Sequence, residues 1–167
     1  APVLGSVPHA EGGTLTILAG GDPDVIDRQE ELLGVLGSIV RAGPPGSGAT
    51  LKIAANAAGI SALVGLGEVL SLTDRLGMDP EIVLDGIGAG PLASLVQRWR
   101  GRITTPVDET HFGAALARKD LELVIEEARR TGVELTVPAA AAERYAAVIE
   151  AGNGGDDFTS VVASIRG

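Results

Sequence analysis

The longest apolar stretch of the chain runs from Ile53 to Leu72, and the expected fold is organised around it. The polar side chains within that stretch are those of Asn56, Ser61, Glu68 and Ser71. A helix that is apolar around most of its circumference must be buried. We therefore predict a central helix from Ser47 to about Leu76, which Gly77 ends.

The segment before this helix alternates short strand-like and helix-like patterns. Residues Thr14 to Ala19 alternate with period two, which is typical of a half-buried strand, and Ser6 to Gly13 is predicted to be a turn-rich connection. The expected elements are strands at Val3 to Gly5, Thr14 to Ala19 and Ser38 to Arg41, with one helix from Asp22 to about Gly37.

The segment after the central helix is predicted to be helical. Asp79 and Pro80 open the next helix, Pro106 and Thr110 lead into a longer one, and Asp156 or Asp157 is expected to cap the last. The expected helices are Pro80 to Asp85, Leu92 to Arg100, Phe112 to Arg130, Val137 to about Ala151 and a last one to Ile165. The fold class is thus mainly α, with a helical domain over 44–167 built on one long helix.

Composition and charge narrow the function classes. A net charge of -9 disfavours nucleic acid and anionic membranes as partners, so a small soluble substrate fits better. Without cysteine there is no disulfide, thiolate nucleophile or cysteine-ligated metal, and two histidines are too few for most zinc sites, so we predict no metal. No secretory signal opens the sequence, and we expect a cytoplasmic protein.

Three glycines inside the central helix need an explanation. Gly59, Gly65 and Gly67 each cost about 1 kcal/mol relative to alanine in a helix interior. Close approach of a second helix would offset that cost. The helix could belong to the same domain or to a second copy of the chain, and we expect a homodimer built through the helical part.

The start of the central helix holds the candidate chemistry. Three glycines and two prolines in the segment 43–48 form a tight loop, in which Ser47 is expected to cap the helix. The loop is no dinucleotide fingerprint, since Leu51 occupies the position where that fingerprint needs a small residue. Lys52 and Asn56 follow one turn apart on one helical face. On spacing alone they could be a solvated pair, but few polar side chains stand on this helix.

Five spaced positions carry a resemblance to a known family. Gly43-x-x-Gly46-x-Gly48-x-x-x-Lys52-x-x-x-Asn56 resembles the catalytic motif of the β-hydroxyacid dehydrogenases, the family of 3-hydroxyisobutyrate and tartronate semialdehyde reductases. The opening residues 1–6 resemble that family's substrate-binding segment. Phe112 with Lys119 and Asp120 resembles the segment that meets the cofactor.

The resemblance implies a role for each matching residue. Lys52 would be the general acid/base, because hydride transfer at a carbinol carbon needs a proton moved at its oxygen. Asn56, Leu4, Gly5 and Ser6 would bind a small carboxylate or aldehyde substrate. The residues that would contact NAD or NADP are Phe112, Lys119 and Asp120.

Two residues qualify these roles. Leu4 stands where the family usually has a serine, which removes one hydroxyl donor to the substrate. Lys119 flanks the apolar stripe of its helix, where a snorkelling surface lysine is the ordinary alternative. Lys52 itself argues against the related imine reductases, which generally lack that lysine.

The resemblance also implies a domain organisation. Residues 1–43 resemble the last strands of a Rossmann-type nucleotide-binding domain, and the chain is expected to be the C-terminal part of a longer enzyme. It would then be inactive alone, with NAD or NADP held mainly by residues that precede it. The competing interpretation is a non-catalytic helical module for dimerisation, with the motif residues as relics.

Overall fold

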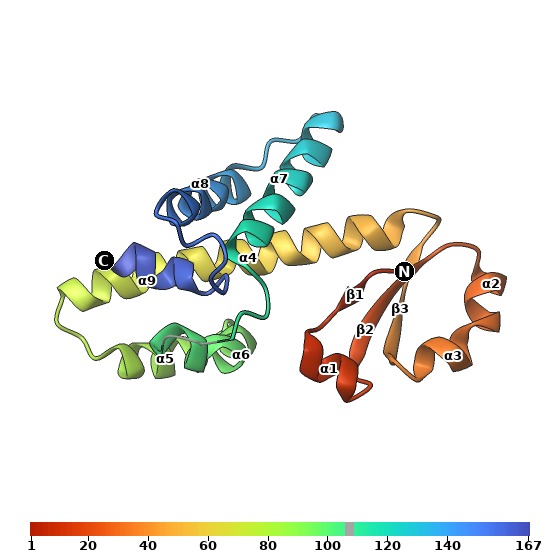
Figure 1. Cartoon of the computed structure of the whole chain (residues 1–167), viewed down its shortest axis with the longest axis horizontal. Helices are drawn as coiled ribbons and strands as arrows, with labels where there is room; N and C mark the ends of the chain where they lie inside the picture. The colour runs from red at the N-terminus through yellow and green to blue at the C-terminus, as the bar shows by residue number, and fades with distance from the viewer. Residues whose placement is uncertain (106–108) are drawn as a thin grey trace. The chain divides into compact units, whose positions relative to one another are not determined.

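The computed structural model describes residues 1–105 and 109–167, which form two compact units, 1–55 and 56–167 (Figure 1). The long helix α4 (Ser47–Arg75) begins in the first unit and continues into the second. Pro106, expected in the lead into a helix, lies outside the described residues. The domain boundary expected after residue 43 stays a prediction.

Unit 1 is built on a three-stranded sheet in the order β1-β2-β3. Strand β2 lies in the middle, antiparallel to β1 and parallel to β3. The parallel pair requires a crossover, which two short helices provide. In chain order the elements are β1 (Val3–Leu4), α1 (Val7–Glu11), β2 (Leu15–Gly20), α2 (Pro23–Arg28), α3 (Glu30–Gly34) and β3 (Gly37–Gly43).

Strand β2 is more buried than its alternating pattern predicted. Ile17, Leu18 and Ala19 are buried in succession, so the expectation of a half-buried strand was wrong. The cause is that β2 is covered on both sides, as a central strand next to a parallel partner often is. The start of α4 packs directly on it: a Cβ atom on Gly48 would lie 2.1 Å from the Leu18 carbonyl oxygen.

Two other expectations for unit 1 are corrected. The connection expected at Ser6 to Gly13 contains helix α1. The single helix expected from Asp22 to Gly37 is divided at Gln29, whose φ of -103° and ψ of 1° depart from helical values. The division places Asp27 and Glu30 on either side of Gln29, and both pair with Arg41 at 2.6 and 3.1 Å.

Unit 2 is helical, as the sequence predicts. Helices α7 and α8 pack together, as do α5 and α6, and the inner face of α4 contributes Ile60, Leu63 and Leu70 to their common core. Among the described helices α4 alone is long and apolar enough to cross a bilayer, by length and composition. Its inner side chains pack in this core. The helices after α4 are α5 (Pro80–Gly88), α6 (Ala93–Thr104), α7 (Ala114–Arg130), α8 (Thr136–Glu150) and α9 (Ser160–Arg166).

Helix ends in unit 2 follow the sequence signals in part. Gly77 adopts a φ of +74° where α4 ends, and the Asp79 carboxylate accepts the Glu81 amide at 2.9 Å, so these two signals are confirmed. The expected cap at Asp156 or Asp157 was wrong, because α9 begins only after Thr159.

The four aromatic residues of the sequence gather around Phe158. Its ring meets those of Trp99 and Phe112 edge to face, with centroids 5.3 and 5.5 Å away. The Tyr145 hydroxyl donates to the Phe158 carbonyl oxygen at 3.0 Å. Burial raises the pKa of the Tyr145 phenol, and the Asp157 carboxylate adds to the rise.

Asp157 is the polar centre beside this cluster. Its side chain is 1% exposed, and its Oδ2 accepts from the Arg102 guanidinium at 2.7 Å and from the His111 amide at 3.2 Å. Its Oδ1 accepts from the Thr159 hydroxyl and amide at 2.7 and 3.2 Å. One carboxylate thus ties the end of α6 and the approach to α7 to the residues before α9.

Candidate active site

The loop before α4 is shaped by its glycines. Gly43 and Gly46 have φ of +112° and +93°, a region that other residues rarely adopt. Gly48 allows the first turn of the helix to approach β2, as described above. Ser47 is the first helical residue rather than the cap that precedes it. The motif glycines therefore have a local structural role in setting where α4 starts.

Lys52 and Asn56 stand in the first turns of α4. Both side chains are half-buried. They are four residues apart in one continuous helix, so their side chains project from the same face. A cation and an amide are thereby presented together, as the spacing predicted.

The structure brings three of the predicted residues together in unit 2. Asn56 donates from Nδ2 to Oδ2 of Asp120 at 2.7 Å, and the Lys119 ammonium lies 3.5 Å from Oδ1 of the same carboxylate. The side chain of Asp120 is 14% exposed, whereas that of Lys119 is 60% exposed. The Asn56 to Asp120 contact spans 64 residues of sequence, and no local pattern signals it.

Phe112 is held in the core of unit 2. Its ring packs on Phe158, and its carbonyl oxygen accepts the Phe158 amide at 2.7 Å. The structure thus gives Phe112 a packing role, while no described contact joins it to Lys119 or Asp120.

The predicted substrate segment lies at the end of β1 in unit 1. Gly5 has a φ of +136°, and a Cβ there would lie 2.6 Å from the Leu15 side chain. The Ser6 amide donates to Nδ1 of His9 at 3.2 Å, and the Ser6 hydroxyl lies 3.1 Å from the same nitrogen. The backbone amide of Ser6, one of the predicted substrate-binding residues, is therefore already bonded to His9. His9 itself lies in α1.

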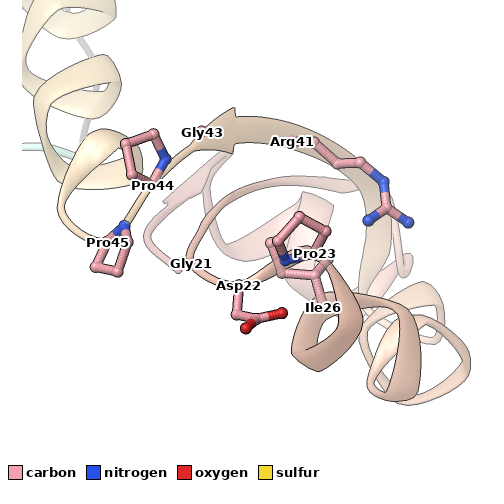
Figure 2. A pocket seen from close by; sticks show the side chains of 8 residues that line it. All are labelled: Gly21, Asp22, Pro23, Ile26, Arg41, Gly43, Pro44 and Pro45. Atoms are coloured by element: carbon pink, nitrogen blue, oxygen red, sulfur yellow. The ribbon is translucent and has the colours of Figure 1, made fainter.

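A separate cavity of about 630 Å³ opens at the carboxyl ends of β2 and β3 in unit 1 (Figure 2). Proline rings and Ile26 form much of its wall, and Arg41 stands at one side. The Arg41 guanidinium is already paired with two carboxylates. None of the predicted site residues lines this cavity.

Comparison with known families covers the chain in two parts. Residues 46–165 match the family model described as NAD-binding of NADP-dependent 3-hydroxyisobutyrate dehydrogenase. Residues 1–43 match the one described as the NAD binding domain of 6-phosphogluconate dehydrogenase. Both descriptions concern NAD binding, and the cofactor class is NAD or NADP.

Individual relatives agree with these matches. Mitochondrial 3-hydroxyisobutyrate dehydrogenase of Pongo abelii is 31% identical over 99% of this chain and 52% of its own length. The 3-sulfolactaldehyde reductase of Escherichia coli is 28% identical over 99% of this chain and 56% of its own. The structure of Mycobacterium tuberculosis 3-hydroxyisobutyrate dehydrogenase with L-serine superposes with a TM-score of 0.84 at 26% identity, covering 100% of this chain and 60% of that one.

The two family-model matches place the chain in the class of pyridine-nucleotide-linked dehydrogenases. More closely, the chain belongs to the β-hydroxyacid dehydrogenase family, of which 3-hydroxyisobutyrate dehydrogenase is a member. The chain spans about half the length of the curated relatives it matches.

Proposed function

We propose that this chain carries the proton-transfer and substrate-binding residues of an NAD(P)-dependent oxidoreductase. The reaction interconverts a small 3-hydroxy acid and its carbonyl form. NAD or NADP, when bound, would supply the hydride chemistry. Lys52 moves the proton at the substrate oxygen, and Asn56, one turn along α4, anchors that oxygen or the substrate carboxylate. The observation that carries the proposal is the pairing of these two polar side chains on one face of α4.

The substrate is proposed to be a short carboxylate or semialdehyde. The related proteins named above act on 3-hydroxyisobutyrate and on 3-sulfolactaldehyde, by their names. Leu4 offers no hydroxyl, and the Ser6 amide already contacts His9. A substrate with less demand for polar contacts at this segment is therefore favoured.

The cofactor residues fit their predicted role unequally. Lys119 suits a contact with the nucleotide, because its exposed ammonium can reach a phosphate or ribose oxygen. Phe112 suits it less, since its ring packs on Phe158. The sequence holds no glycine-rich dinucleotide fingerprint. We therefore infer that this chain alone neither turns over substrate nor binds NAD(P) tightly. Calorimetric titration of the chain with NAD and with NADP tests this, and a dissociation constant in the low micromolar range for either would contradict it.

Lys52→Ala tests the proposed acid/base in the full-length protein. We expect kcat to fall by about 100- to 10,000-fold with cofactor affinity nearly unchanged. Lys52→Arg should fail almost as badly, because a guanidinium keeps its proton near neutral pH. Arg75→Ala, which removes a cation from the far end of the same helix, serves as the control and should retain turnover. Wild-type turnover in Lys52→Arg would make Lys52 an electrostatic anchor only.

We further propose that two copies of the chain associate through α4. An apolar stripe runs along its outer side at alternating spacings of four and three residues, and in it Val69 and Leu72 are 46% and 58% exposed. The members of this outer stripe of α4, each exposed or half-buried, are Ala58, Ala62, Gly65, Val69 and Leu72. A stripe with this spacing is typical of a helix that packs along another helix.

The three helix glycines divide into two kinds. A Cβ on Gly59 would meet Trp99 at 3.5 Å, and one on Gly67 would meet Ile165 at 3.2 Å, so both permit packing within the chain. A Cβ on Gly65 would meet nothing within 4 Å. Gly65 lies in the outer stripe, where the absence of a side chain would let a partner helix approach closely.

Gly65→Ala tests the association, because alanine should stabilise the helix of a single chain but weaken the contact between two chains. Alanine stabilises a solvent-exposed helix position by about 1 kcal/mol over glycine. Against a closely packed partner, the added methyl group should instead weaken association, as sedimentation at micromolar concentration would show. Gly101→Ala on α6, also with open space around it, should leave association unchanged. A wild-type mass of 16.9 kDa would defeat the proposal.

A non-catalytic dimerisation module remains the alternative, and the outer stripe of α4 is the observation that favours it. Such a module would dimerise with no measurable hydroxyacid dehydrogenase activity in the full-length protein. Lys52 and Asn56 could then be replaced without any effect beyond stability.

A further inference from the structure

The contact between Asn56 and Asp120 joins the start of α4 to the middle of α7. Its length of 2.7 Å is that of a charge-assisted hydrogen bond. Asp120 is mostly buried, so water competes weakly for its carboxylate oxygens. Its second oxygen has the Lys119 ammonium at 3.5 Å, which balances its charge. Each carboxylate oxygen therefore has one polar group of the protein itself beside it.

The chemistry of the two groups determines how the Asn56 amide is oriented. An ionised carboxylate only accepts hydrogen bonds, whereas a primary amide has a donating nitrogen and an accepting oxygen. Asp120 therefore admits only the orientation in which Nδ2 faces α7. The Oδ1 atom and the second N–H of Asn56 are then not used by Asp120.

We propose that Asp120 is a positioning residue for Asn56 rather than a contact for the nucleotide. This inference rests on the proposed function. The substrate oxygen is a hydroxyl donor on one side of the reaction and a carbonyl acceptor on the other. An amide that offers one acceptor and one donor can hold it in both forms. Without Asp120 the side-chain amide of Asn56 can flip, which exchanges the positions of its donating nitrogen and its accepting oxygen.

Steady-state kinetics of Asp120→Asn in the full-length protein tests the inference. Asparagine keeps the shape but can donate as well as accept, so it no longer selects one orientation. We expect kcat/KM for the hydroxy acid to fall about 10- to 100-fold, the loss of one well-placed hydrogen bond, with the NAD(P) dissociation constant within about twofold of wild type. Asp120→Glu, which restores an acceptor-only group, should recover part of the loss. A weakened NAD(P) affinity with an unchanged substrate KM would overturn the inference.

The double variant separates positioning from an independent contribution. If Asp120 acts through Asn56, then Asp120→Asn adds little to the loss already caused by Asn56→Ala. Losses that multiply would overturn the inference. Glu122→Gln is the matched control on the same helix, because Glu122 pairs on the surface with Arg118 at 2.9 Å. It removes one negative charge and should leave all kinetic constants unchanged.

A measurement without turnover distinguishes this inference from the proposed function. The side-chain amide resonances of Asn56 should shift in Asp120→Asn and stay in place in Glu122→Gln, as nuclear magnetic resonance would record. Resonances that do not move in Asp120→Asn would overturn the contact itself. A wild-type protein without hydroxyacid dehydrogenase activity would overturn the proposed function, and with it the assignment of the oriented amide to substrate, while the amide shift would still support the contact.

Discussion

Loss of the buried Asp157 carboxylate should strongly destabilise unit 2. Its carboxylate accepts four hydrogen bonds, one of them from the Arg102 guanidinium, and is almost completely buried. Removing one partner of a buried ion pair costs about 3 to 5 kcal/mol, because the other partner is left without its counter-charge. Asp157→Ala should reach this range.

Asp157→Asn should lower the free energy of unfolding less than Asp157→Ala does, with a cost of about 2 to 3 kcal/mol. The amide oxygen can still accept from Thr159, but the charge-assisted bond to Arg102 is lost, which alone accounts for about 1.5 to 3 kcal/mol. The amide nitrogen would in addition face donors from Arg102 and His111. For a chain of this length each kcal/mol corresponds to a melting shift of about 2 to 4 °C.

The assay is the urea and thermal midpoint of the chain by far-ultraviolet circular dichroism. Asp156→Asn is the matched control, because the neighbouring side chain is exposed and makes none of these contacts. A surface change of this kind stays within about 0.5 kcal/mol. If Asp157→Asn shifted the midpoint no more than Asp156→Asn does, the carboxylate would not hold α6 and the approach to α7 together, and the reasoning from burial would be wrong.

Two further predictions follow from contacts within one unit. The Arg166 guanidinium lowers the pKa of Asp74 below its usual 3.8. The stability from this pair is therefore complete above about pH 4 and is lost as the pH falls further. In an acid titration, Asp74→Asn should lower the free energy of unfolding by about 0.5 kcal/mol at pH 7 and by progressively less toward about pH 2. Gly48→Ala should destabilise unit 1 by about 1 to 3 kcal/mol in denaturant melts, because its methyl group would overlap the Leu18 carbonyl, whereas Gly34→Ala meets open space and should be tolerated.

The sequence predicts best where local signals are strong. Helix α4 was expected from Ser47 to about Leu76 and ends at Arg75, because a long apolar run and a glycine with positive φ both mark its extent. The break at Gln29 was missed because the apolar stripe continues across it, and the ion pairs of Arg41 with both short helices appear only in three dimensions.

The candidate site was predictable only as separate positions. The spacing of Lys52 and Asn56 within one helix gives their common face directly. The hydrogen bond of Asn56 to Asp120 depends on how α7 packs against α4. The two residues are 64 positions apart, and local sequence patterns do not predict a contact over such a separation. The burial of β2 was likewise misjudged, since part of its cover comes from α4, which lies further along the chain.

The aromatic cluster around Phe158 gives the chain a built-in optical probe. Trp99 is the single tryptophan, so the indole emission of the protein comes from one place, edge to face with Phe158. Phe112, which precedes α7, packs its ring on the same Phe158 ring. Any movement of Phe112 would therefore reach the indole through one intervening side chain. The intrinsic fluorescence of Trp99, excited at a wavelength at which tyrosine does not absorb, should therefore report on movements of the segment before α7 in real time.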